Sequence, residues 1–113
     1  MNRNRVLKSL AALAQATRLE AFRLLVQAGP DGLAAGDLAA RLDITPPALS
    51  FHLRGLAHAG LIQARQQGRF IYYSADYDAM RSLVGFLTEN CCGGAACMPA
   101  QGSGRKTNLR RLA

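Results

Sequence analysis

The sequence has no tryptophan, and aromatic residues make up only 6% of its 113 positions. It also has no long apolar run, including behind the basic first residues Met-Asn-Arg-Asn-Arg. A signal peptide and a transmembrane helix both require such a run, so neither is expected. We expect one small cytoplasmic domain with no membrane partner, of a size that dimerisation would help to stabilise.

Acidic residues are scarce: seven Asp and Glu stand against fourteen Lys and Arg, for a net charge of +7. This excess favours a polyanionic partner such as nucleic acid. Part of it, however, lies near the C-terminus at Arg105, Lys106, Arg110 and Arg111, beside glycine and serine. Charged ends of this kind are usually solvated arms. The placement of basic residues in the folded part therefore matters more than the total.

Cysteine is absent except for one cluster, in which Cys91, Cys92 and Cys97 fall within seven residues. A closed zinc site takes four ligands, and both histidines, His52 and His58, lie far upstream. A disulfide fits poorly, because the count is odd, adjacent cysteines close a strained ring and the cytoplasm is reducing. Thiolates select soft metals, so we interpret the cluster as a sensor site for a soft, thiol-seeking ion.

Two other interpretations of the cluster stay open, besides the plain one of small apolar residues in a tail. Cys91 or Cys92 could oxidise to a sulfenic acid that a neighbouring thiol converts to a disulfide, which would make a redox or electrophile switch. Cadmium, lead or bismuth could occupy the same sulfur ligands. Enzymatic activity is not expected, because no cysteine has a nearby histidine and acidic residue in a recognisable catalytic pattern, and His52 has no nucleophile beside it.

Helical periodicity covers the first part of the chain. Apolar residues recur at helical spacing over 3–13 and again over 19–26, with the two helices meeting near Gln15. The Gly29-Pro30-Asp31-Gly32 segment ends the second helix. A short helix is predicted over 35–42.

The segment from Thr45 to Gly60 carries the clearest local signal. Thr45 can cap a helix, Pro46 suits its first turn, and leucines recur on one face. Two β-prone runs, 61–65 and 70–74, follow and are joined through 66–69, which predicts a two-stranded hairpin. Asp76 can cap a last helix, which we expect to end near Asn90 and Cys91.

These elements predict a mainly α-helical fold with a β-hairpin wing, the winged helix-turn-helix. The DNA-binding and dimerisation domain should span residues 1–92. A flexible tail, 93–113, should hold the third cysteine and the basic end.

Leu49, Leu53 and Leu56 form the apolar face of the fourth helix, so its opposite face should enter the major groove of double-stranded DNA. Serine, arginine and phenylalanine on that face can meet a base edge, a phosphate and a thymine methyl group respectively. The residues assigned to DNA contact are Thr45, Pro47, Ser50, Phe51, His52 and Arg54 around this helix, and Arg65, Gln67 and Arg69 on the wing.

Three stretches together resemble the ArsR/SmtB family of bacterial metalloregulators. They are Thr17-Arg18-Leu19, the segment from Ala48 to Leu53 with Ala59-Gly60-Leu61-Ile62 after it, and Gly68-Arg69-Phe70-Ile71-Tyr72-Tyr73-Ser74. The resemblance covers about residues 4–92. It implies a repressor that binds operator DNA as a homodimer through its first and last helices and leaves the DNA when an inducer binds.

The chain departs from the family pattern in its third helix. Many arsenic-sensing members carry a Cys-x-Cys pair just before Asp-Leu, whereas this chain reads Ala34-Ala35-Gly36-Asp37-Leu38. Similarity to the subgroup with thiols at the end of the last helix implies that Cys91, Cys92 and Cys97 take this role. The expected inducer is trivalent arsenic or antimony, with no cofactor required. Gln15 and Phe51 also differ from the Asp and the polar residue common in the family.

Overall fold

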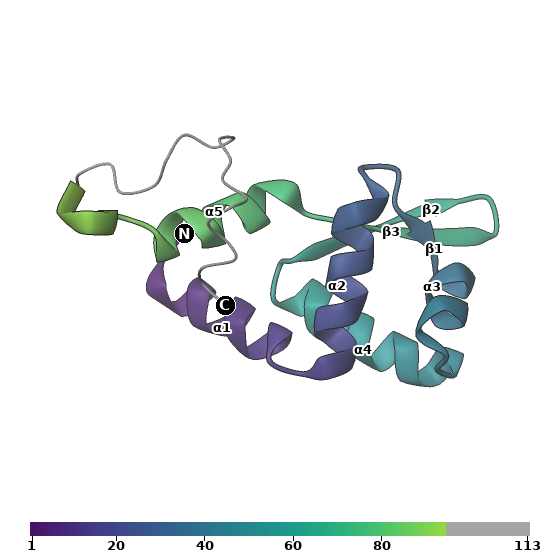
Figure 1. The fold of residues 1–113 in the computed structure, drawn as a ribbon. Coiled ribbons are helices and arrows are strands. Elements are labelled where there is room, and N and C mark those ends of the chain that lie inside the picture. Colours follow the sequence, from purple (N-terminus) through teal and green to yellow (C-terminus); the bar gives the residue numbers. More distant parts are fainter. Residues whose placement is uncertain (95–113) are drawn as a thin grey trace, which may run out of the picture.

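The computed structural model describes residues 1–94, which form five α-helices and a three-stranded antiparallel sheet (Figure 1). Their order is α1 (Arg3–Leu13), α2 (Ala16–Ala28), β1 (Leu33–Ala34), α3 (Ala35–Leu42), α4 (Pro46–His58), β2 (Ile62–Gln67), β3 (Phe70–Ala75), α5 (Tyr77–Leu87) and the short 3-10 helix η1 (Cys91–Gly94). The predicted winged helix-turn-helix is confirmed: α3 and α4 form the helix-turn-helix, and the hairpin of β2 and β3 is the wing. No helix in this part of the chain is long and apolar enough to span a membrane.

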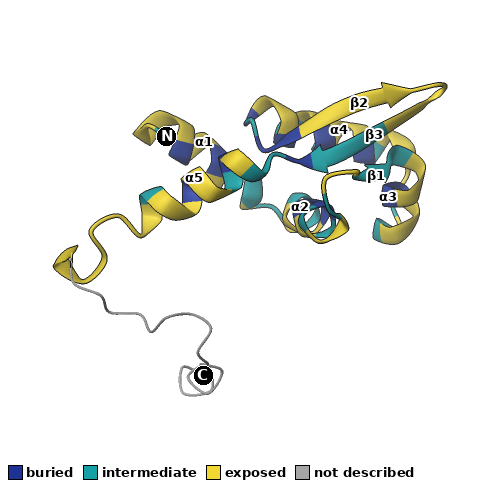
Figure 2. Ribbon diagram, turned by 90° about the horizontal axis from the view of Figure 1, so that it is seen from above, coloured by how far each residue is buried: buried dark blue, intermediate teal, exposed yellow. Residues whose placement is uncertain are grey.

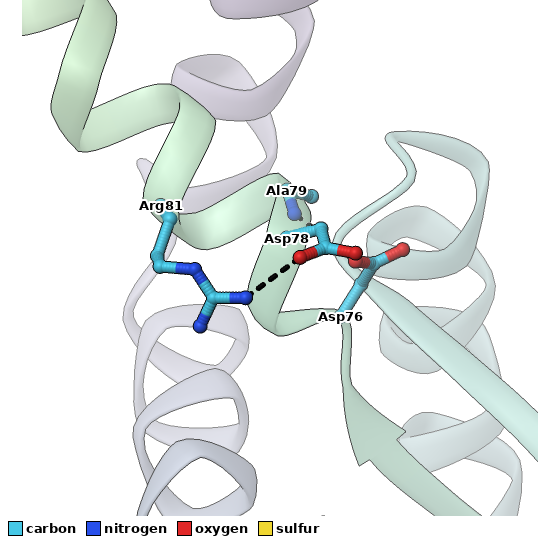
Figure 3. A network of polar contacts seen from close by, with 4 residues as sticks. All are labelled: Asp76, Asp78, Ala79 and Arg81. Carbon is cyan, nitrogen blue, oxygen red and sulfur yellow. Dashed lines mark hydrogen bonds and ion pairs between the residues drawn. The ribbon is translucent and has the colours of Figure 1, made fainter.

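Side-chain caps fix the start of several helices. The side chains of Gln15, Thr45 and Asp76 each accept a hydrogen bond from the backbone amide three residues further on, at 2.8, 3.3 and 3.0 Å. Such a bond satisfies one of the amides that a helix start leaves without a partner. Figure 3 shows Asp76 in this role at the start of α5, beside the Asp78–Arg81 ion pair. The predicted caps Thr45 and Asp76 are confirmed, and Gln15 caps α2 in the place of the usual aspartate.

The hydrophobic core lies between α2, α3, α4 and the base of the wing. Leu25, Leu38, Leu56 and Leu61, one from each of these parts, are at most 1% exposed. Figure 2 shows buried segments on the helices and at the base of the wing, whereas the outer half of the wing is exposed. The core thus holds α4 by one face and leaves its opposite face open.

The sheet has a third strand that the sequence did not predict. β1 pairs with β3 through Leu33–Tyr73 and Ala34–Tyr72, so the strand order is β1-β3-β2. Gly32, with φ of 76°, lies so close to β3 that a Cβ atom there would be 2.0 Å from the Tyr73 carbonyl oxygen. A two-residue strand is too short to show alternation, which is why only the folded chain reveals it.

Two element boundaries differ from the prediction. The wing loop is shorter than 66–69, because Gln66 and Gln67 pair with Ile71 and Phe70 and extend β2. The last helix ends at Leu87, before the expected end near Asn90 and Cys91. Thr88 donates its hydroxyl to the Val84 carbonyl at 2.8 Å, and Asn90 has a left-handed φ of 54°, so the chain turns before the cysteines.

Candidate nucleic-acid interface and cysteine site

The outer face of α4 is exposed as predicted. Leu49, Leu53 and Leu56 are buried, and the predicted outward residues on the other side are exposed: Pro47, Ser50, Phe51, Arg54 and His58. Phe51 is 60% exposed, so it does not belong to the core. The helical phase is therefore confirmed, while contact of these residues with DNA stays a prediction.

An open hollow of about 740 Å³ lies along the outer face of α4, and its lining residues are Arg18, Phe51, Arg54, Gly55, Ala57 and His58. Arg18 belongs to α2, so the hollow joins two helices. Two guanidinium groups beside an exposed aromatic ring form a surface suited to a nucleic-acid backbone and its bases. The sequence pattern along α4 does not indicate Arg18, because this residue lies on another helix.

His52 lies at the flank of α4 and is half-buried. Its Nδ1 atom is 3.3 Å from Nη1 of Arg18, and its ring meets Phe51 edge-to-face with centroids 5.3 Å apart. The predicted flanking position is confirmed. Its hydrogen-bond partner within the protein, however, is a side chain from another helix, which periodicity along α4 does not show.

The wing separates its predicted residues into two groups. Arg65 donates to the Asp31 carbonyl at 3.4 Å and to Gln67 Oε1 at 3.3 Å, and its guanidinium lies 5.1 Å from the Tyr72 ring centroid. Arg65 and Gln67 thus lie together along one side of the wing. Arg69 lies in the loop at the tip, next to Phe70, which is 58% exposed.

The cysteines follow the last helix after a short turn. Cys91 and Cys92 lie in η1, are exposed, and have Sγ atoms 3.8 Å apart. Cys97 lies outside the residues that the structure describes. Within residues 1–94 no group of three or more His, Cys, Asp and Glu side chains could hold a metal ion, so a three-sulfur site needs a ligand from beyond them.

Cys92 is disulfide-bonded in this structure, which differs from the expectation that the cysteines are thiols. That expectation came from the reducing cytoplasm, and a compartment sets the redox state of a cysteine independently of the fold.

Helices α1 and α5 lie side by side at the end of the molecule opposite the wing (Figures 1 and 2). They carry four large aliphatic residues that are exposed: Leu7, Leu10, Val84 and Leu87. The cysteine turn η1 directly continues from this pair of helices. The apolar α1–α5 surface and the cysteine turn therefore lie at the same end of the molecule.

This chain is similar to a known domain family and to several known proteins. A helix-turn-helix domain family matches residues 13–63. The transcriptional repressor SdpR of Bacillus subtilis is 33% identical over 76 residues, covering 67% of this chain and 81% of SdpR. A homodimeric winged helix-turn-helix DNA-binding domain from Mycobacterium bovis, a possible ArsR-family regulator, is 25% identical with a TM-score of 0.63, covering 85% and 89%. A possible transcriptional regulator for arsenical resistance is 28% identical with a TM-score of 0.63, covering 79% and 97%.

Proposed function

Because this chain belongs to the ArsR family of winged helix-turn-helix transcriptional regulators, we propose that it is a metalloid-responsive repressor of the cytoplasm. It binds operator DNA as a homodimer, and trivalent arsenic or antimony releases it. The observation that carries the proposal is the pair of neighbouring sulfurs, 3.8 Å apart, on the exposed turn after α5.

DNA binding is assigned to α4 and the wing. The exposed side chains of α4 enter the major groove, and Arg69 at the wing tip contacts the backbone or the minor groove. In a two-fold symmetric dimer the two α4 helices meet successive major grooves, about 34–36 Å apart, so the operator is an inverted repeat. The apolar α1–α5 surface supports this dimer, as does the homodimeric relative.

The sulfur geometry supports a shared soft ion. The Sγ atoms of Cys91 and Cys92 lie 3.8 Å apart, and neighbouring thiolates are the ligands that soft ions prefer. The separation belongs to a state in which Cys92 is disulfide-bonded, so reduction of Cys92 must precede binding of one ion by both sulfurs. Cys97 supplies the third thiolate that trivalent arsenic takes. Bound arsenic would join Cys97 to η1, the turn that follows α5.

This position links the inducer to DNA through the dimer. The α5 helix carries part of the apolar surface, so a change at its end alters how the two α4 helices are spaced. An inducer changes DNA affinity only by binding the two states differently, typically by about 1–3 kcal/mol, and bound DNA weakens inducer binding by the same factor.

The test is an operator-release titration of the reduced dimer, on a fluorescent duplex selected by the protein from a random library. Arsenite should lower DNA affinity, whereas magnesium, a hard cation that thiolates do not select, should leave it unchanged. No release by arsenite would sink the proposal.

The Cys97→Ser variant identifies the third ligand. Methylated trivalent arsenic needs only two thiolates, so this variant should lose its response to arsenite and keep its response to the methylated form. An equal response to both would show that Cys97 does not bind. Competition with cadmium, lead and bismuth ranks the soft ions on the same sulfurs.

A thiol switch is the second candidate, and the disulfide-bonded state of Cys92 favours it. Peroxide would oxidise a thiolate to a sulfenic acid, and a second thiol would displace water from it to form a disulfide. Release of DNA by peroxide, with no response to arsenite, would select this function.

A further inference from the structure

Arg18 connects three helices through one guanidinium group. It lies in the first turn of α2, where its Nε donates to the Ala12 carbonyl near the end of α1 at 2.8 Å. Its Nη1 lies 3.3 Å from Nδ1 of His52 on α4. The residue is half-buried, so these bonds are partly screened from water.

Gly55 provides the space that this side chain occupies. A Cβ atom at this position would lie 3.3 Å from Cδ of Arg18 and 3.7 Å from its Nε and Nη1. Glycine inside a helix is unfavourable relative to alanine. Its presence in α4 is explained if the close approach of Arg18 is required.

The contact determines which nitrogen of His52 carries the proton. A guanidinium only donates hydrogen bonds, so Nδ1 must accept and the neutral ring carries its proton on Nε2. Within residues 1–94, no hydrogen bond joins the Nε2 atom of His52 to another group. Among these residues, the only side-chain polar atom that is both buried and without a partner is the Ser9 hydroxyl, so Nε2 is not buried. Nε2 therefore reaches the surface as a donor.

We infer that Arg18 is a positioning residue for DNA binding: it holds the His52 ring in the Nε2–H tautomer and aims this donor at a phosphate oxygen of the operator. The inference rests on the proposed function. A donor fixed in place before binding loses less rotational freedom when DNA arrives. A neutral imidazole releases no counterion, so its contribution is independent of salt, unlike that of an arginine.

The first experiment reads the tautomer directly in the free protein, without DNA. Long-range nitrogen–proton correlation spectra should show His52 protonated on Nε2 alone. Gly55→Ala, which crowds Arg18 while favouring the helix, and Arg18→Met should both give a mixture of tautomers. An Nδ1–H ring in the unaltered protein, or a spectrum that neither variant changes, would overturn the inference.

The second experiment is a double-mutant cycle on the selected duplex. Arg18→Met should weaken DNA binding about tenfold, the effect of losing one hydrogen bond to a charged group. In His52→Gln, whose amide donor has no tautomer, the same change should cost less than twofold. Arg23→Met, an exposed arginine of α2, is the matched control for lost charge.

An equal loss from Arg18→Met in both backgrounds would overturn the role of His52, because Arg18 would then act by itself. Thermal unfolding of each variant separates this outcome from misfolding. If the unaltered protein binds no duplex, the proposed function fails and the DNA contact fails with it, while the spectra still report whether Arg18 sets the tautomer.

Discussion

Replacing Leu87 by alanine should weaken the dimer by about a hundredfold. Leu87 is 58% exposed in the protomer and lies at the end of α5 on the apolar surface shared with α1. The substitution removes three carbons, each worth about 0.8 kcal/mol on full burial. Dimerisation would bury the 58% of the Leu87 surface that is exposed in the protomer, so the substitution should cost about 1.4 kcal/mol of dimerisation free energy per protomer. Two-fold symmetry doubles it to about 2.8 kcal/mol, or two factors of ten.

Sedimentation velocity over a dilution series measures this dissociation constant. Alanine is a strong helix former, so α5 should persist and circular dichroism should be unchanged. Ile71→Ala is the matched control, since Ile71 is 42% exposed but belongs to strand β3, where it pairs with Gln66 beside the wing loop. An unchanged dissociation constant for Leu87→Ala, or an equal loss for Ile71→Ala, would refute dimerisation through the α1–α5 surface.

Three further changes test other parts of the structure. Arg54→Ala should reduce the slope of log affinity against log salt by about 0.9, the value for one phosphate contact, and an unchanged slope in anisotropy titrations would exclude that contact. Tyr77→Phe removes the hydroxyl that bonds the Leu25 and Val26 carbonyls at 3.3 and 3.0 Å, so urea denaturation should show about 1 kcal/mol less stability; no loss would mean that water replaces it. Gln15→Ala removes the 2.8 Å hydrogen bond that caps α2, which should lower the free energy of unfolding by about 1 kcal/mol and Tm by about 4–8 °C in calorimetry. An unaltered Tm would show that the cap makes no net contribution to stability.

The helices were predictable because their signals are local. Thr45 and Asp76 cap helices through amides three residues away, and the leucines of α4 repeat at helical spacing, so both features are visible in the sequence. The same periodicity predicts which side of α4 is exposed, and Phe51 lies on that side as expected. The predicted end of α5, near Asn90 and Cys91, lies beyond the observed end at Leu87, because periodicity does not indicate the backbone conformations of Thr88 and Asn90.

The interface was only partly predictable, because some of its residues come from different elements. The sequence pattern predicts His52 at the edge of the outer face of α4, but its partner Arg18 is 34 positions away on α2. Gly55 was a possible signal of a close contact, since it is a glycine inside a segment with an otherwise helical pattern. Its explanation still required the position of Arg18.

The sequence by itself determined the order of the helices, the wing, the open face of α4 and the clustering of all three cysteines. Each depends on residues close together in the chain, where spacing alone fixes geometry. Only the tertiary structure decided that β1 joins the sheet and that Arg18 passes Gly55 to reach His52. Such contacts join segments far apart in the chain. Packing of the whole core determines which of them meet.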